Sequence, residues 1–178
     1  MAKNRTAFQS IYVVFILSLF FLLALRPIEA FDTFWQLQSG KYIWQTQSFI
    51  YTDLFSIAKD VPRVEHCWLS DLIFCGLYSL GGYGLLGLLK PLLITLCGVM
   101  LYRWNRQQGV AAAVALPVLG LCLLASEPSW LVRPQLWTFV LSLLYIHLLY
   151  AGRQWGLRAW LWLVPLMALW ANLHAACV

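Results

Sequence analysis

The sequence has few charged residues: Asp, Glu, Lys and Arg make up 11% of its 178 residues, against about 25% in soluble domains. Hydrophobic residues make up 62%. This composition excludes a soluble monomer, because too little polar surface is left to cover the apolar side chains. The net charge of +5 does not indicate nucleic-acid binding, because Lys and Arg stand at the ends of apolar blocks, where they orient membrane helices.

Metal-type cysteine spacing, internal repeats and low-complexity linkers are also lacking. The five cysteines stand at positions 67, 75, 97, 122 and 177. We interpret most of them as small apolar fillers, with a bridge between Cys67 and Cys75 as the alternative. Without repeats or linkers, the chain is predicted to form one membrane domain over residues 1–178.

Long apolar runs are what the sequence does have. Each is of the length that crosses a hydrocarbon layer of about 30 Å as a helix. The pattern predicts an all-α, polytopic transmembrane bundle with about five spans and an extracytoplasmic loop, 26–82, that contains interfacial helices. The predicted spans are 7–25, 83–102, 109–125, 135–151 and 159–177.

Six basic residues before or between the spans predict their orientation. With five crossings all six fall on one side, which the positive-inside rule makes cytoplasmic. They are Lys3, Arg5, Arg103, Arg106, Arg153 and Arg158. We therefore expect an integral membrane protein with a cytoplasmic N-terminus.

Two segments allow alternatives. Residues 68–82 are apolar enough for a sixth span, but they are short and contain Asp71, so we favour an interfacial or re-entrant helix. The first block resembles a signal peptide, with Ala30 as a candidate cleavage residue, but its apolar stretch is long and we interpret it as a span.

Polar residues at the outer membrane surface are the candidate functional groups. Asp32 follows the first span and is either a general base or the cap of a helix starting at Thr33. Glu65 and His66 could shuttle protons, or a solvated turn could explain them. Asp32, Asp53 and Glu65 together supply oxygen ligands suited to Mg²⁺ or Mn²⁺.

A second set of polar residues lies in or beside the later spans. Arg133 opens the fourth span, where its guanidinium suits a phosphate or anchors the helix at the interface. The other candidates are Lys90, Gln135, Asn172 and His174. Because the predicted topology brings distant stretches to one membrane face, it predicts one site for a substrate that is half lipid and half polar, such as a polyprenyl phosphate carrying a sugar.

The order of these motifs resembles a known group. Asp32 precedes the stretches WQLQSG at 35–40, YTDLFS at 51–56, EHCWL at 65–69, RPQ at 133–135 and WANLH at 170–174. The pattern is similar to bacterial polytopic proteins that look like membrane glycosyltransferases of the GT-C type. Those enzymes depend on polyprenyl-phosphate sugars and include protein mannosyltransferases and oligosaccharyltransferases.

The resemblance implies that Asp32 is the catalytic acidic residue and that the donor phosphate lies near the outer leaflet. It implies that Asp53 and Glu65 assist the acceptor or a metal ion, Mg²⁺ or Mn²⁺. Expected partners are membrane lipids, a lipid-linked sugar donor and other membrane subunits, and no nucleic acid. The chain has fewer spans than such enzymes, so it is expected to be their amino-terminal part, to pair with another subunit, or to be a non-catalytic accessory subunit.

Overall fold

The computed structural model describes residues 2–55, 57 and 61–175, except for the side chains of 2–10, 154, 155 and 159. Within that part the fold is all-helical, as predicted, with one isolated bridge between Thr52 and Pro62. In chain order the elements are α1 (Ala2–Ala24), α2 (Asp32–Thr46), α3 (Trp68–Gln107), α4 (Ala112–Ser126), the 3-10 turn η1 (Glu127–Ser129), α5 (Gln135–Trp155), α6 (Leu157–Leu161) and α7 (Leu163–Leu173).

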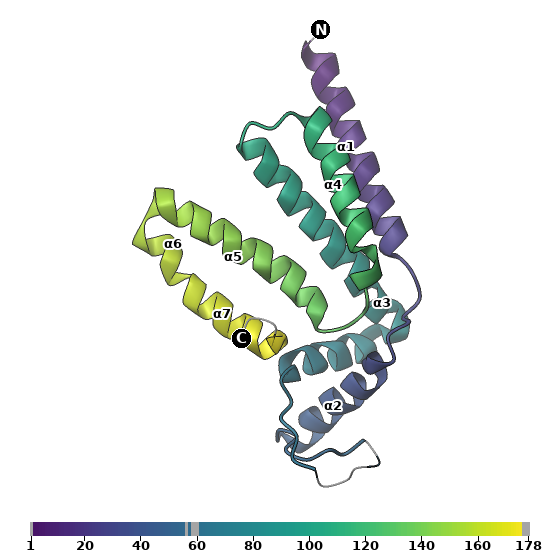
Figure 1. Cartoon of the computed structure of the whole chain (residues 1–178). Coiled ribbons are helices and arrows are strands. Elements are labelled where there is room, and N and C mark those ends of the chain that lie inside the picture. The colour runs from purple at the N-terminus through teal and green to yellow at the C-terminus, as the bar shows by residue number, and fades with distance from the viewer. Residues whose placement is uncertain (1, 56, 58–60, 176–178) are drawn as a thin grey trace.

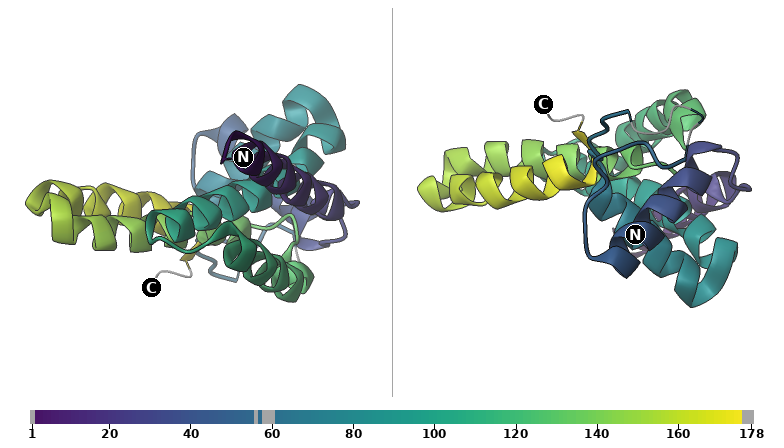
Figure 2. Two further views of the ribbon diagram at one scale, coloured as in Figure 1. Left: turned by 90° about the horizontal axis from the view of Figure 1, so that it is seen from above. Right: turned by 90° about the horizontal axis from the view of Figure 1, so that it is seen from below.

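The helices form a bundle, a lateral cap and an arm. The lateral cap is α2 with the first part of α3, and the arm is α5, α6 and α7. α1, α4 and the later part of α3 run alongside one another, while α2 and the first part of α3 lie across one end (Figure 1). α5 and α7 pair with each other and project away from this group (Figure 2). We call the end that carries α2 the α2 end. We call the opposite end, where α3 finishes after Arg103 and Arg106, the basic end.

A kink divides α3 at two glycines. Gly81 and Gly82 have non-helical dihedral angles, and Gly82 has φ +60° with ψ −155°, a backbone conformation that a side chain would strain. Without the kink, the 40 residues of α3 would extend about 60 Å, twice the hydrocarbon thickness. Residues 68–80 measure only about 20 Å and lie beside α2. This geometry favours the interfacial placement of 68–82 over a sixth span.

Three helical segments among the described residues are long and apolar enough to cross a membrane, which indicates an integral membrane protein: α3, α4 continued by η1, and α5. α1 and α7 contribute shorter apolar stretches, so the five-span count and the side of the N-terminus stay predictions. The predicted span 159–177 is not one continuous helix, because the helix is interrupted at Trp162, between α6 and α7. Pro165 explains the break, since it has no N–H to donate to the Leu161 carbonyl. Residues 176 and 177 of that span lie outside the described residues.

Buried side chains join the lateral cap to the bundle. One cluster consists of Leu37 on α2, Phe74 and Leu86 on either side of the α3 kink, and Val132 just before α5. Phe74 and Leu86 have no exposed surface. Burying such side chains contributes about 1.5–3 kcal/mol each, so the cap is fixed against the bundle and positions the polar residues described below.

The described cysteines are free thiols. Cys67, Cys75, Cys97 and Cys122 are unbridged, as the filler interpretation predicts, while Cys177 lies outside the described residues. Burial is the main cause that raises the pKa of the Cys67 thiol, to about 11, with the nearby Asp71 and Glu65 carboxylates adding to it. Cys67 is therefore a protonated, weakly nucleophilic thiol at neutral pH.

Candidate functional site

Asp32 and Arg133 meet at the α2 end. Arg133 Nη2 lies 2.6 Å from Asp32 Oδ2, and Trp35 Nε1 donates to Asp32 Oδ1 at 3.3 Å. The pair is open to the exterior, with 41% of the Asp32 side chain and 35% of the Arg133 side chain exposed. The structure therefore brings into contact two of the residues that the sequence analysis assigned to one site.

The helix-cap interpretation of Asp32 is wrong. α2 begins at Asp32 itself, Phe31 holds the N-cap position, and the helix start has no side-chain cap hydrogen bond. The Asp32 carboxylate turns to Arg133 instead, because a charge-assisted bond to a guanidinium is about twice as strong as a bond to a neutral donor.

One sequence neighbour of each residue in the pair is buried. Thr33, next to Asp32, has no exposed surface, and its Oγ1 donates to the Val132 carbonyl at 2.8 Å. Val132, next to Arg133, is 1% exposed and belongs to the cluster that joins α2 to α3. The neighbouring bonds thus hold the acid and the guanidinium in reach of each other before any ligand arrives.

Arg63 gathers the other loop carboxylates beside this pair. Its guanidinium carbon lies 4.4 Å from the centre of the Trp35 ring. Its Nη2 is 3.4 Å from Glu65 Oε2, and its Nη1 is 3.9 Å from Asp53 Oδ1. A pair of backbone hydrogen bonds, Asp53 N to Val61 O and Arg63 N to Tyr51 O, both 2.9 Å, brings Asp53 and Arg63 together.

This arrangement bears on the predicted roles of the loop residues. Glu65 pairs with Arg63 and His66 is exposed, and proton shuttling by these two residues stays a prediction. Among the residues that the structure describes, no three metal-binding side chains gather, and Asp32 and Asp53 each face an arginine. The arginines compete with a cation for these two carboxylates, and a role for Mg²⁺ or Mn²⁺ stays a prediction.

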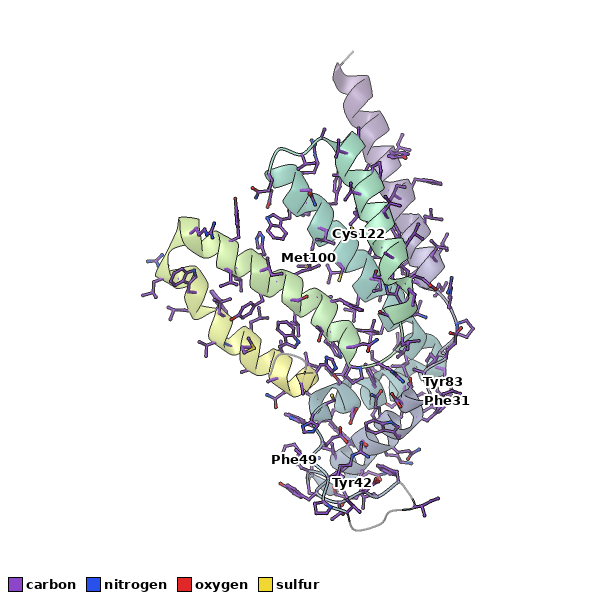
Figure 3. The ribbon with its side chains drawn as sticks, in the orientation of Figure 1. Phe31, Tyr42, Phe49, Tyr83, Met100 and Cys122 are labelled. Carbon is purple, nitrogen blue, oxygen red and sulfur yellow. The ribbon has the colours of Figure 1, made fainter. Side chains whose placement is uncertain are left out.

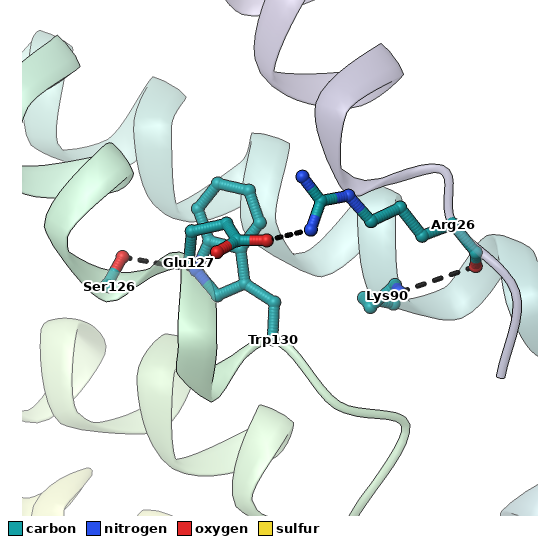
Figure 4. A network of polar contacts seen from close by, with 5 residues as sticks. All are labelled: Arg26, Lys90, Ser126, Glu127 and Trp130. Atoms are coloured by element: carbon teal, nitrogen blue, oxygen red, sulfur yellow. Dashed lines mark hydrogen bonds and ion pairs between the residues drawn. The ribbon is translucent and has the colours of Figure 1, made fainter. Parts of the chain in front are cut away.

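Lys90 belongs to a different polar group. It is 4% exposed on α3, and its Nζ donates to the Arg26 carbonyl at 3.4 Å. The Arg26 guanidinium pairs with Glu127 of η1, as Figure 4 shows. Lys90 thus joins the ends of α1 and α4 to α3, and the predicted role of Lys90 beside Asp32 is not supported by its contacts.

Three further predicted ligands have helix-joining contacts. Gln135 Nε2 donates to the carbonyl of Ser129, the last residue of η1, at 2.8 Å. Trp68 Nε1 donates to Asn172 Oδ1 at 2.7 Å, which ties α3 to α7. His174 Nδ1 shares a hydrogen bond of 2.8 Å with Thr138 of α5. Asn172 and His174 thus hold α7 against α3 and α5, and their role as ligands stays a prediction.

Replacing Asn172 by alanine is expected to destabilise the protein by about 1–2 kcal/mol, because the Trp68 N–H loses its acceptor in a half-buried place. Unfolding in detergent, followed by circular dichroism, measures the loss. Asn105→Ala is the matched control, since Asn105 donates only to its own helix, as Asn172 also does through Nδ2. An Asn172→Ala protein of unchanged stability that binds donor more weakly would support the ligand role instead.

A cavity of 440 Å³ adjoins the Asp32 group. Trp35, which bonds to Asp32, forms part of its wall, together with Lys41 of α2 and Tyr78 and Tyr83 around the α3 kink. The rings of Tyr78 and Tyr83 meet edge to face with centres 4.8 Å apart. Figure 3 labels Tyr83 beside Phe31, at the junction of the cap and the bundle. A space with aromatic walls and one cation suits a polar ring that carries a negative charge.

Sequence reasoning missed two residues at this end. Arg63 has no recognisable motif, and only its proximity in sequence to Glu65 could have indicated a partner. Asp71 has no exposed surface, and neither of its carboxylate oxygens has a hydrogen-bond partner within the described structure. Its place in an apolar segment was visible in the sequence, but its burial against α2 was not. Comparison of the chain with protein-family models, curated proteins and solved structures finds no match.

Proposed function

We propose that this protein transfers a glycosyl group from a lipid-linked sugar to an acceptor hydroxyl at the α2 end, with Asp32 as the general base. The observation that carries the proposal is the contact of 2.6 Å between Asp32 and Arg133. It puts a carboxylate that can take a proton next to a guanidinium that can hold a phosphate, at an exposed place beside an aromatic cavity. The ordered motifs of the sequence indicate the same chemistry.

The mechanism begins with an exchange of partners. The donor phosphate binds the Arg133 guanidinium and displaces the Asp32 carboxylate, which stays oriented by Trp35 Nε1. The sugar occupies the cavity along the Trp35 wall. Asp32 then takes the proton of the acceptor hydroxyl, and the oxygen of that hydroxyl attacks the anomeric carbon of the sugar. The bond between that carbon and the phosphate oxygen breaks, the lipid phosphate leaves with the electron pair, and the configuration inverts.

Kinetics of the reconstituted protein test this mechanism. The full chain in liposomes receives a panel of radiolabelled polyprenyl-phosphate sugars, and release of the lipid phosphate is measured. Asp32→Asn is expected to lower kcat by at least about 100-fold, because it removes the general base. Its KM for the donor stays equal or falls, since Arg133 no longer has a competing carboxylate.

Arg133→Gln is expected to give the opposite pattern, a donor KM raised about tenfold or more, because the phosphate loses its charge-assisted bonds. Tyr150→Phe is the control, since it removes one hydrogen bond to Gln108 at the basic end and leaves the α2 end intact. An Asp32→Asn protein that keeps full turnover would end the proposal.

A second candidate function is that of a non-catalytic subunit in a larger membrane assembly. The arm made by α5, α6 and α7 favours it, because Trp160, Trp162 and Val164 are 51%, 67% and 73% exposed there. A partner helix would bury this surface. Purification in mild detergent then yields a stoichiometric partner, and the assembly keeps its activity with Asp32→Asn.

A further inference from the structure

Two adjacent cavities lie along the contact between α3 and α5, away from the Asp32 group. The cavity nearer the basic end has a volume of 380 Å³ and lies between α3 and α5. The other has a volume of 250 Å³ and is lined on a third side by α4. Leu101 and Leu143 line both cavities, and we call the two together the α3–α5 groove. Figure 3 labels one wall residue of each cavity, Met100 and Cys122.

The length of the α3–α5 groove matches one membrane leaflet. Its walls on α3 run from Ile94 to Gln107, which is about 20 Å at 1.5 Å per residue. Half of the hydrocarbon layer measures about 15 Å. Most of the side chains along it are apolar, with Leu the most frequent, so a single hydrocarbon chain is the occupant whose length and polarity agree with the groove.

The end of the groove carries positive charge without a counter-charge. Arg103 lines the cavity nearer the basic end and is exposed. In the sequence every Asp and Glu lies between 29 and 71 or at 127, toward the other end of the bundle. None of the described carboxylates forms an ion pair with Arg103, so an anion must come from outside the described protein.

An unsatisfied donor lies at the same end. Trp104 also lines the cavity nearer the basic end, and its Nε1 is buried without an acceptor in the described part of the chain. A buried donor without a partner costs about 1–3 kcal/mol, so its presence beside a cavity calls for an acceptor from elsewhere. A phosphate or ester oxygen supplies that acceptor.

We propose that the α3–α5 groove binds one anionic phospholipid from the leaflet at the basic end, with the phosphate on Arg103 and one acyl chain along Leu101 and Leu143. This site is independent of the proposed glycosyl transfer. A lipid held here fills the space between the arm and the bundle and sets the angle at which α5 leaves α3. It differs from general contact with the bilayer, because the groove selects the charge of the head group.

Lipid titration of the purified full chain tests the site. The delipidated protein in detergent receives phosphatidylglycerol or phosphatidylcholine with identical acyl chains, and native mass spectrometry counts the bound lipids. One phosphatidylglycerol is expected to bind per chain, with an affinity about tenfold above that of phosphatidylcholine, because guanidinium bonds to an anionic head are charge-assisted and the second lipid carries no net charge. Binding is expected to raise Tm.

Two variants test the lipid head group and the acyl chain separately. Arg103→Gln removes the preference for phosphatidylglycerol and keeps the fold, since Arg103 is exposed. Leu143→Trp fills the junction of the two cavities and lowers the affinity for both lipids. Arg153→Gln is the matched control, because Arg153 is an exposed arginine near the end of α5 that lines neither cavity.

Three results would overturn the proposal. The first is wild-type binding without preference between the two lipids. The second is an equal loss of binding in Arg103→Gln and Arg153→Gln, which would mean general attraction to a basic surface. The third is a dimer that Leu143→Trp dissociates and Arg103→Gln leaves intact, which would mean that a second copy of the chain fills the groove.

Discussion

Gly40→Ala is expected to destabilise the protein by about 3 kcal/mol or more. A Cβ on Gly40 would lie 2.1 Å from the Asp71 carbonyl oxygen and 2.6 Å from its carbon. Both atoms belong to the backbone of α3, so no side-chain rotation relieves the clash. α2 must therefore move away from α3, which opens the cluster around Phe74 and shifts Asp32 relative to Arg133.

Unfolding in detergent, followed by circular dichroism, measures this effect. Gly76→Ala is the control on the adjacent helix, because a Cβ there finds no atom within 4 Å. Alanine at an open helical position is expected to stabilise by up to about 1 kcal/mol. A Gly40→Ala protein that unfolds at the wild-type temperature would mean that α2 and α3 do not cross at this distance.

Asparagine at position 71 is expected to stabilise the protein at pH 8 by about 2 kcal/mol or more and to remove a pH dependence. The Asp71 carboxyl lies in the part of α3 before the kink, outside the predicted spans, with no exposed surface. Burial, reinforced by the Glu65 carboxylate and opposed by Arg63, raises the pKa of Asp71 to about 8. The amide of asparagine has the same shape as the carboxyl and carries no charge to bury. The two Asp71 oxygens have no hydrogen-bond partner in the described structure, so the substitution removes no hydrogen bond recorded there.

The sign follows from proton binding. Between an unfolded pKa of 3.8 and a folded pKa of about 8, the folded protein holds a proton on Asp71 that the unfolded chain has lost. The stabilisation from neutral Asp71 is therefore complete below pH 3.8 and declines as the pH rises through 8. Unfolding free energies from pH 6 to 8 should fall in the wild type and stay level in Asp71→Asn.

Asp32→Asn is the control for this titration. Asp32 is 41% exposed and paired with Arg133, so its removal leaves the decline from pH 6 to 8 in place. A wild-type protein whose stability is level over that range would contradict the assignment to Asp71.

The candidate site was predictable in part. The sequence predicted that Asp32 and Arg133 face the same membrane surface, because position along a span determines how deep in the membrane a residue lies, and the structure brings the two into contact. The sequence could not predict the contacts of Lys90, Asn172 and His174. Each of these residues bonds to a distant segment of the chain, which depends on how its helix is rotated. A difference of one or two residues along a helix changes the face by 100° or more, and apolar composition on all sides leaves that rotation undetermined.

The sequence by itself determined the membrane class, the helical character and the place where α3 turns, because each depends on local composition. Few charges and long apolar runs require helices in lipid, and Gly81 and Gly82 permit dihedral angles that other residues avoid. Tertiary structure alone decided the contacts between helices: the Arg63 position over Trp35, the burial of Asp71 and the α3–α5 groove. Such contacts depend on rotation and crossing distance, which arise from packing of side chains far apart in the chain.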